Sequence, residues 1–147
     1  MAVSMKKEQH HSKHSASIER RTPFAASMEP SFASDTLNDL LKFIAVHGNF
    51  AKPDISLKLV SRRINLSSRH IGRLFRRSMG QSFRGYICDL RIAKAADLLQ
   101  LTPQHSIKAV VAMVGYRSRS HFDKDFRERL GCTPAQFQKR HHHYSVE

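Results

Sequence analysis

The sequence predicts an all-α protein in which two similar helical units are joined by one long helix. Three observations support this prediction. Apolar residues recur at helical spacing from Leu37 onwards, residues 83–100 contain no helix breaker after Gly85, and the pattern of residues 60–86 returns in residues 110–137. A chain of 147 residues suits a single domain that carries a tail.

Positive charge is concentrated in the second part of the chain. The sequence has 25 Lys and Arg against 12 Asp and Glu, a formal net charge of +13. Residues 55–140 hold 18 of those basic residues and only 5 of the acidic ones. Such an excess indicates a nucleic acid, an anionic membrane surface or an acidic protein as the partner.

A membrane partner is disfavoured by the pattern of the chain. The cationic faces are interrupted by turns and backed by apolar stripes, unlike one continuous amphipathic helix. No apolar run approaches the roughly 20 residues of a membrane span, and the N-terminus lacks the apolar core of a secretory signal. We therefore expect no membrane partner and a cytoplasmic location.

Both ends of the chain are predicted to be tails. Residues 1–33 are rich in Ser, His, Lys and Ala, have no sustained apolar period and are interrupted by Pro23 and Pro30, which indicates disorder. The folded domain is expected over residues 34–140, and residues 141–147 are expected to form a flexible C-terminal tail.

No metal or cofactor is expected. Histidines gather at His10, His11 and His14 and again at residues 141–143, but no carboxylate or thiol is arranged to complete either set. The two cysteines, Cys88 and Cys132, are too few and too far apart for a zinc site or a disulfide framework.

The first predicted helix begins with Ser34 or Asp35 as its cap and ends near His47–Gly48. Its apolar face carries Leu37, Leu40, Leu41, Ile44 and Ala45.

A short helix over residues 55–64 follows, then a turn at Asn65–Leu66 and a helix that runs from a Ser67 or Ser68 cap to Met79. The last of these buries Ile71, Leu74 and Phe75 and leaves a basic face free, made of Arg69, Gly72, Arg73, Arg76 and Arg77. Two helices around a tight turn, the second with a basic outer face, form the helix-turn-helix pattern.

A long helix over residues 83–100 comes next, after Gly80 ends the previous helix and Ser82 caps the new one. Its eighteen positions span roughly 27 Å. Such a helix can hold two small modules at a fixed distance.

The helix-turn-helix pattern then occurs again. Thr102–Pro103 breaks the long helix, Ser106 caps a short one, Gly115 turns, and a helix follows that is predicted to bury Phe122, Phe126 and Leu130. Its opposite face carries Arg119, Ser120, Asp123, Lys124 and Arg127. An offset of 51 pairs the two halves at nine positions: Ser67 with Ser118, His70 with His121, Ile71 with Phe122, Phe75 with Phe126, Arg76 with Arg127, Met79 with Leu130, Gly80 with Gly131, Ser82 with Thr133 and Tyr86 with Phe137.

Upstream of the turn the offset is 50, so the second turn is one residue longer than the first. Nine pairs in register indicate an internal duplication rather than two unrelated hairpins.

Residues 55–140 resemble the DNA-binding domain of the AraC/XylS family of bacterial transcription regulators. The match lies in the segment GYRSRSHFDKDFRERLGCTPAQFQKR of the second unit, in LSSRHIGRLFRRSMGQSFRGYI of the first, and in Arg91, Ile92, Ala93, Ala96, Leu98 and Leu99 of the long helix. The resemblance implies two helix-turn-helix subdomains of about seven helices in all, with two recognition helices set into successive major-groove segments on one side of a duplex. Successive segments lie roughly 34 Å apart, a separation of the same order as the long helix with its flanking turns.

One chain could then bind double-stranded DNA as a monomer, and the site should be asymmetric because the two surfaces differ in sequence. By position, the resemblance places the base-facing residues at Arg69, Gly72 and Arg73 in the first helix and at Arg119, Ser120, Asp123 and Lys124 in the second. Arg76, Arg77 and Arg127 lie farther along their helices and are expected to contact the DNA backbone.

Two of these positions leave alternatives open. Asp123 could accept a hydrogen bond from cytosine N4, or it could form a surface salt bridge with Arg119 or Arg127 four residues away. Gly72 stands where the family often carries a side chain that reaches a base. Base readout by the first unit is therefore expected to depend on Arg69 and Arg73, since an Arg can bind guanine through two hydrogen bonds.

No enzymatic activity is expected, because the sequence has no nucleophile elbow, phosphate loop, helical metal-ligand pair or carboxylate pair in an apolar setting. DNA-repair alkyltransferases with a similar helical domain need a cluster of cysteines, and two isolated ones argue against that chemistry.

The resemblance suggests an activator that contacts RNA polymerase and acts at the nucleoid. The alternatives are a repressor that occupies a promoter and a protein-interaction module that modulates another regulator. The chain leaves no room for the large ligand-sensing domain of most family members, so we expect a stand-alone regulator or one that receives its signal through a protein partner.

Overall fold

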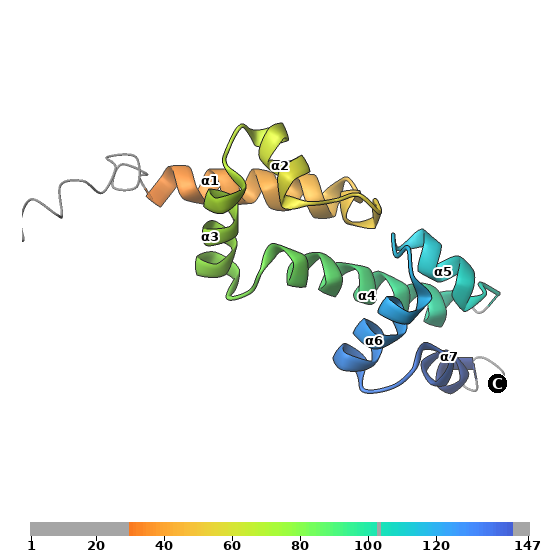
Figure 1. Cartoon of the computed structure of the whole chain (residues 1–147). Coiled ribbons are helices and arrows are strands. Elements are labelled where there is room, and N and C mark those ends of the chain that lie inside the picture. The colour runs from red at the N-terminus through yellow and green to blue at the C-terminus, as the bar shows by residue number, and fades with distance from the viewer. Residues whose placement is uncertain (1–29, 103, 143–147) are drawn as a thin grey trace, which may run out of the picture. The chain divides into compact units, whose positions relative to one another are not determined.

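The computed structural model describes residues 30–102 and 104–142 of the chain, with side chains from Ser34 onwards. These residues form seven α-helices and two short helical segments of other types, and no strand occurs among them (Figure 1). The predicted all-α fold is confirmed. The predicted tail lies outside the described residues up to position 29, as do residues 143–147.

Helix α1 (Pro30–Leu41) continues into a π-helical segment, Lys42–Val46, and a short 3-10 segment, Asn49–Ala51, follows. The helix begins at Pro30, before both predicted caps, Ser34 and Asp35, so that prediction is wrong. Proline is favoured at the first position of a helix, where its missing N–H would have had no partner within the helix.

The first helix-turn-helix unit consists of α2 (Leu57–Ile64) and α3 (Ser68–Met79). The Ser56 hydroxyl accepts the backbone N–H of Leu59 at 3.2 Å, and the Ser67 hydroxyl accepts that of His70 at 3.2 Å. Each cap satisfies an N–H that the first turn of a helix leaves free. Asn65 ends α2 in the left-handed region, with φ of 53°.

The long helix α4 runs from Phe83 to Leu101, and its 19 residues span roughly 28 Å. Figure 1 shows it joining the first unit to the second. Its N-terminal half contributes Phe83 and Ile87 to one hydrophobic core, and its C-terminal half contributes Ile92, Ala95 and Leu99 to the other. The linker is therefore part of both cores.

The second unit consists of α5 (Ile107–Met113) and α6 (Arg119–Leu130), and α7 (Pro134–His142) packs behind it. Ser106 and Ser118 cap α5 and α6 as Ser56 and Ser67 cap their counterparts. At α7, Gln136 N–H donates to the Thr133 hydroxyl and Thr133 N–H donates to the Gln136 side chain, which is a capping box. The helix continues two residues beyond the predicted boundary at residue 140.

Two hydrophobic cores correspond to the two units. Leu40, Ile44, Val60, Ile71 and Phe75 are fully buried in the first. The second buries Val110, Val111, Val114, Phe122 and Phe126. The ring of Phe75 lies 5.5 Å from that of Tyr86, and the equivalent pair Phe126 and Phe137 lies at 5.6 Å. The two halves that match in sequence therefore also match in packing.

Two residues of the predicted apolar stripes do not fit. Leu74 of α3 was predicted to be buried with Ile71 and Phe75, but it is only half-buried and is not part of the first core. Leu130 was expected to be buried with Phe122 and Phe126, but it is 39% exposed. It is the last residue of α6, beyond the part of the helix that packs against α4 and α5.

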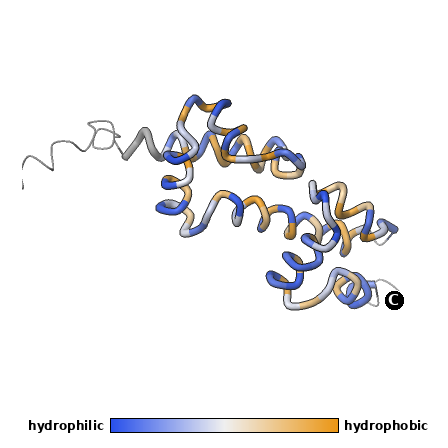
Figure 2. The backbone as a smooth tube through the Cα atoms, viewed as in Figure 1, coloured by the Kyte–Doolittle hydropathy of each residue, from blue (hydrophilic) through white to orange (hydrophobic). Residues whose placement is uncertain are grey.

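Hydrophilic residues predominate along α6, whereas α5 is mainly hydrophobic (Figure 2). Within the described ranges, none of the helices combines the length and the apolar character that a membrane span requires. The same ranges contain no group of three or more His, Cys, Asp or Glu residues placed to hold a metal ion.

Candidate nucleic-acid interface

The outer face of α3 is cationic throughout. Arg69, Arg73, Arg76 and Arg77 are exposed, and the opposite face of the helix buries Ile71 and Phe75. The helix contains no carboxylate, and none of the ion pairs found within the described part of the chain involves it. Four guanidinium groups are thus presented to solvent along one helix of 12 residues.

Gly72 lies within this face, close to α2. A Cβ atom placed on it would lie 3.8 Å from Leu57 Cδ1, an ordinary van der Waals distance. Packing therefore does not require a glycine there.

The outer face of α6 carries paired charges instead. Arg119 Nε donates to Asp123 Oδ1 at 2.7 Å, and the side chains of these residues are 48% and 32% exposed. Lys124 Nζ lies 3.8 Å from Glu128 Oε1. Of the two alternatives for Asp123, the structure contains the salt bridge to Arg119; whether Asp123 also contacts a base stays a prediction.

The other predicted residues of α6, Ser120, Lys124 and Arg127, are exposed. The structure therefore places all the predicted positions of the second unit on one exposed side of α6. This side of α6 lies opposite the fully buried Phe122 and Phe126, as the basic face of α3 lies opposite the fully buried Phe75.

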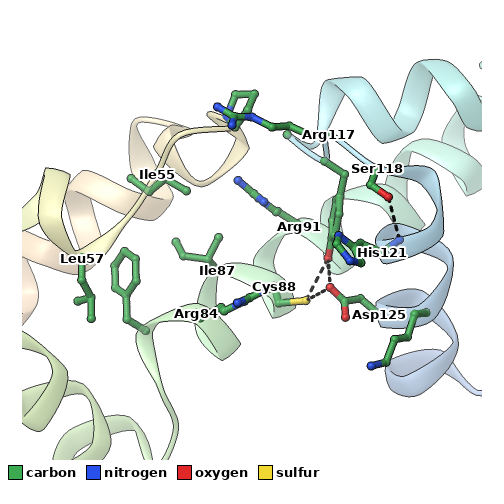
Figure 3. Close-up of a pocket in the computed structure, with 15 residues that line it drawn as sticks. Ile55, Leu57, Arg84, Ile87, Cys88, Arg91, Arg117, Ser118, His121 and Asp125 are labelled. Carbon is green, nitrogen blue, oxygen red and sulfur yellow. Dashed lines mark hydrogen bonds between the residues drawn. The ribbon is translucent and has the colours of Figure 1, made fainter.

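A cavity of about 630 Å³ lies between the two units, beside their direct contacts. Figure 3 shows Arg84 on α4, Arg117 in the turn before α6 and His121 on α6 around it. Lys124 also lines it, so the cavity adjoins the predicted base-facing side of α6. Its apolar wall is formed by Ile55, Leu57, Phe83 and Ile87. Arg84, Arg117 and His121 are not among the site residues predicted from the sequence.

Arg91 of α4 connects the two units at the end of this cavity. Its Nε donates to the carbonyl of Phe50 and its terminal NH2 donates to the carbonyl of Lys52, both at 2.8 Å. Its guanidinium carbon also lies 5.4 Å from the centre of the Tyr116 ring, within cation–π range. Burial lowers the pKa of Arg91, and the nearby Tyr116, Cys88 and Asp125 oppose that shift.

Gly115 makes the second contact between the units. Its φ is 83°, a conformation that other L-residues rarely adopt. A Cβ atom on it would lie 2.2 Å from the carbonyl oxygen of Ala51, which is a backbone atom that cannot move aside alone. The turn before α6 therefore packs directly on the 3-10 segment of the first unit, and only glycine fits.

Cys88, Tyr116 and Asp125 form a hydrogen-bonded cluster beside Arg91 (Figure 3). Asp125 Oδ2 accepts from Cys88 Sγ at 2.9 Å and from the Tyr116 hydroxyl at 2.8 Å. Burial and the bond to Asp125 raise the pKa of Cys88 to about 11, so the thiol keeps its proton at neutral pH. The cluster joins α4, the turn and α6.

The charge of Asp125 is stabilised within this cluster. Burial alone would raise its pKa, but the hydrogen bonds from Cys88 and Tyr116 and the positive charges of Arg129 and Arg84 hold that pKa below its usual value. Arg129 in turn donates to Asp89 of α4 at 2.6 Å. Two separate side-chain contacts thus fasten α6 to the linker helix.

These junction residues could not be assigned from helical periodicity. Except for Tyr116 and Asp125, which are 9 residues apart, the side-chain hydrogen bonds that join them span 28 to 41 residues. Nothing in the spacing of a single sequence pairs these positions. The resemblance pointed to Arg91 and to the Gly–aromatic turn as matching positions, but it gave them no partners.

Comparison with known proteins identifies the domain. Residues 60–140 match a family described as a helix-turn-helix domain. The chain is 30% identical over 122 residues to an uncharacterized helix-turn-helix transcriptional regulator, YfiF of Bacillus subtilis, and the match covers 82% of the chain and 38% of that protein.

Two solved structures are similar in fold. The C-terminal domain of AraT, a response regulator from Geobacillus stearothermophilus, is 25% identical with a TM-score of 0.67 over 78% of the chain and 88% of that domain. The DNA-binding domain of the global transcriptional factor AdpA, solved in complex with a target DNA, has a TM-score of 0.68 at 22% identity, over 76% of the chain and 97% of that domain. The chain spans only 38%, 25% and 28% of the lengths of three curated relatives that it matches.

Proposed function

We propose, because the chain belongs to the AraC-type helix-turn-helix family of transcription regulators, that it binds duplex DNA by inserting α3 and α6 into adjacent major-groove segments. The observation that carries this proposal is the pair of equivalent helices that α4 holds in one domain. Each has a buried apolar stripe, Ile71 and Phe75 in α3 and Phe122 and Phe126 in α6, and an exposed polar face. A major groove admits one such helix, and two successive segments admit two.

Base readout is assigned to the residues that the sequence placed on these faces. In the first half-site Arg69 and Arg73 bind base edges, and Gly72 has no side chain to reach a base. In the second, Arg119, Ser120 and Lys124 face the bases, and Asp123 orients Arg119 through their salt bridge. Because these two sets differ, one protomer recognises an asymmetric site.

Backbone contacts come from residues at the edges of these faces. Arg76, Arg77 and Arg127 lie farther along α3 and α6 and hold the phosphates beside each half-site. Arg84 and Arg117, exposed around the cavity next to Lys124, face the DNA strand that passes between the half-sites. Neither residue is among the positions predicted from the sequence.

The regulatory outcome is activation of transcription at the nucleoid, by contact with RNA polymerase from a promoter-bound protomer. Family membership supports this part of the proposal. Transcription in vitro from a template that carries the selected site distinguishes it from repression, since an activator raises the transcript yield with purified polymerase and a repressor lowers it.

The decisive experiment selects duplexes from a randomised library with the purified protein and repeats the selection with Arg73→Ala and Lys124→Ala. Each variant should lose the base preference at one position of one half-site, because a good bidentate contact discriminates by about 1–3 kcal/mol. Lys42→Ala removes the same charge from a residue outside both recognition helices, and its selected site should equal that of the wild type.

Two results would contradict this assignment. A uniform loss of affinity across all sequences would mean that Arg73 and Lys124 contact phosphates. A selected duplex whose affinity does not change with salt would remove the electrostatic basis of the proposal, since log affinity should fall linearly with log salt.

A further inference from the structure

We propose that the spacing between the two half-sites is set by a lock in addition to the linker helix. The lock consists of Arg91, Gly115 and the 3-10 segment Asn49–Ala51 with its C-cap Lys52. The inference rests on the proposed binding of DNA through α3 and α6. Arg91 and Gly115 act as positioning residues: they touch no base, and they fix where the second recognition helix lies relative to the first unit.

The linker helix alone does not fix the orientation of one unit relative to the other. Because α4 takes part in both cores, it fixes the distance between the units along its own axis. A single rod still allows each unit to tilt or rotate relative to the other as the helix bends and twists, and long helices do curve. A second contact away from the axis is needed to remove that motion.

Arg91 supplies such a contact. It projects from α4 beside the turn before α6 (Figure 3), and its two donors bind the carbonyls of Phe50 and Lys52 in the first unit. A planar guanidinium with two hydrogen bonds fixes direction as well as distance. Phe50 itself packs against the first core, so the carbonyls that Arg91 binds belong to a well-supported segment.

Gly115 sets the closest approach of the units. A Cβ atom would lie within 2.2 Å of the Ala51 carbonyl oxygen and 2.7 Å of its carbonyl carbon. This is a contact of backbone with backbone, which does not depend on the rotamer of a side chain. Any side chain at position 115 would push the turn away from the first unit.

Tyr116, which follows Gly115, connects the turn to α6. The Tyr116 backbone N–H binds the Val111 carbonyl at 3.0 Å, its ring lies 5.3 Å from that of Phe122, and its hydroxyl donates to Asp125 of α6. The turn and the helix therefore move as one body. The extra residue of the second turn lies at this point, between the left-handed Gly115 and the Ser118 cap.

A locked pair of recognition helices should tolerate little change in spacing. One additional base pair moves the second half-site by about 3.4 Å and rotates it by about 35° around the duplex axis. The wild-type protein cannot follow such a shift, so it must give up the contacts of one unit.

The test uses the best duplex selected from the randomised library, together with two derivatives that have one base pair inserted or deleted between the half-sites. Affinities for the three duplexes are measured for the wild type, Arg91→Ala, Arg91→Lys and Lys94→Ala. Lys94→Ala is the matched control, since it removes a positive charge from an exposed position of the same helix that lies outside the junction. Circular dichroism verifies that each variant is folded.

We expect the wild type to prefer the original spacing strongly. In Arg91→Ala that preference should fall by roughly tenfold, the factor that corresponds to one charged hydrogen bond. Arg91→Lys should keep part of the preference because an ammonium can still donate to a carbonyl, and Lys94→Ala should keep all of it. Gly115→Ala should bind most tightly to a duplex of changed spacing. It should not bind all three duplexes equally.

The failures are distinguishable. If Arg91→Ala weakens binding to all three duplexes by the same factor, Arg91 serves stability only and the lock is overturned, while the proposed function stands. If the wild type selects no duplex, the proposed function fails, and the lock fails with it.

Discussion

Helices α3 and α6 occupy equivalent places in the two units, yet they carry their charges in different ways. The first has four arginines and no carboxylate. The second has four basic residues and three acidic ones, Asp123, Asp125 and Glu128, and each of these acidic residues has a partner within the protein. The duplication kept the interior of the unit and allowed its surface to diverge.

The difference suggests a division of labour between the units. All four arginines of α3 are available to an incoming polyanion, so the first unit should supply more of the salt-dependent affinity. In α6 the side chain of Arg119 is held by Asp123 before DNA arrives, which reduces its charge but defines its orientation. The second unit should therefore contribute relatively more discrimination between bases.

The largest effect, a loss of folding stability, is expected in the two cores, where the units are most alike. Phe75→Ala and Phe126→Ala each remove a fully buried ring at equivalent positions, and each should lower the free energy of unfolding by about 3–5 kcal/mol in urea denaturation. Leu130→Ala, at an exposed position of α6, is the control and should cost far less. A large loss for only one phenylalanine would show that the two cores are not equivalent.

An intermediate effect, on duplex affinity, is expected at the paired charges of α6, where the units differ. Asp123→Asn should raise duplex affinity by roughly three- to tenfold at low salt, because it frees Arg119 and removes a negative charge near the phosphates. Folding stability should change little, since an exposed salt bridge contributes under about 1 kcal/mol. Asp97→Asn, at an exposed position of α4, controls for net charge.

Quantitative binding to the selected duplex decides between the two roles of Asp123. If Asp123→Asn instead lowers the affinity only for duplexes that carry a cytosine at one position, the carboxylate accepts a hydrogen bond from that base.

The smallest effect concerns Gly72, which occupies the position equivalent to Asp123. Gly72→Ala should stabilise the protein by about 0.5–1 kcal/mol, because alanine favours the helix and its Cβ meets only Leu57 at 3.8 Å. Thermal unfolding would measure the gain, with Gly115→Ala expected to change stability in the opposite direction. A destabilised Gly72→Ala would show that α2 and α3 pack more tightly than this distance implies.

Much of the fold could be predicted because it depends on local chemistry. Ser67, Ser82 and Ser106 cap helices as predicted, through hydrogen bonds that span three residues, and Gly80 and Gly131 end helices in the left-handed conformation. Ser56 and Ser118 form caps of the same kind, which are not among those predicted from the sequence. Such signals are contained within one turn of chain. The predicted cap at Ser34 or Asp35 is wrong because α1 begins at Pro30, and proline is compatible with the first position of a helix.

The amino-acid sequence by itself determined the two helical units, the linker helix and the exposed cationic faces, since periodicity places each residue on its own helix. Only the tertiary structure decided which of those residues meet. Three contacts join segments far apart in the chain: Arg91 with the carbonyls of Phe50 and Lys52, Gly115 with Ala51, and Asp125 with Cys88. Their existence depends on how the two cores are oriented around α4, and that orientation is a property of packing rather than of local pattern.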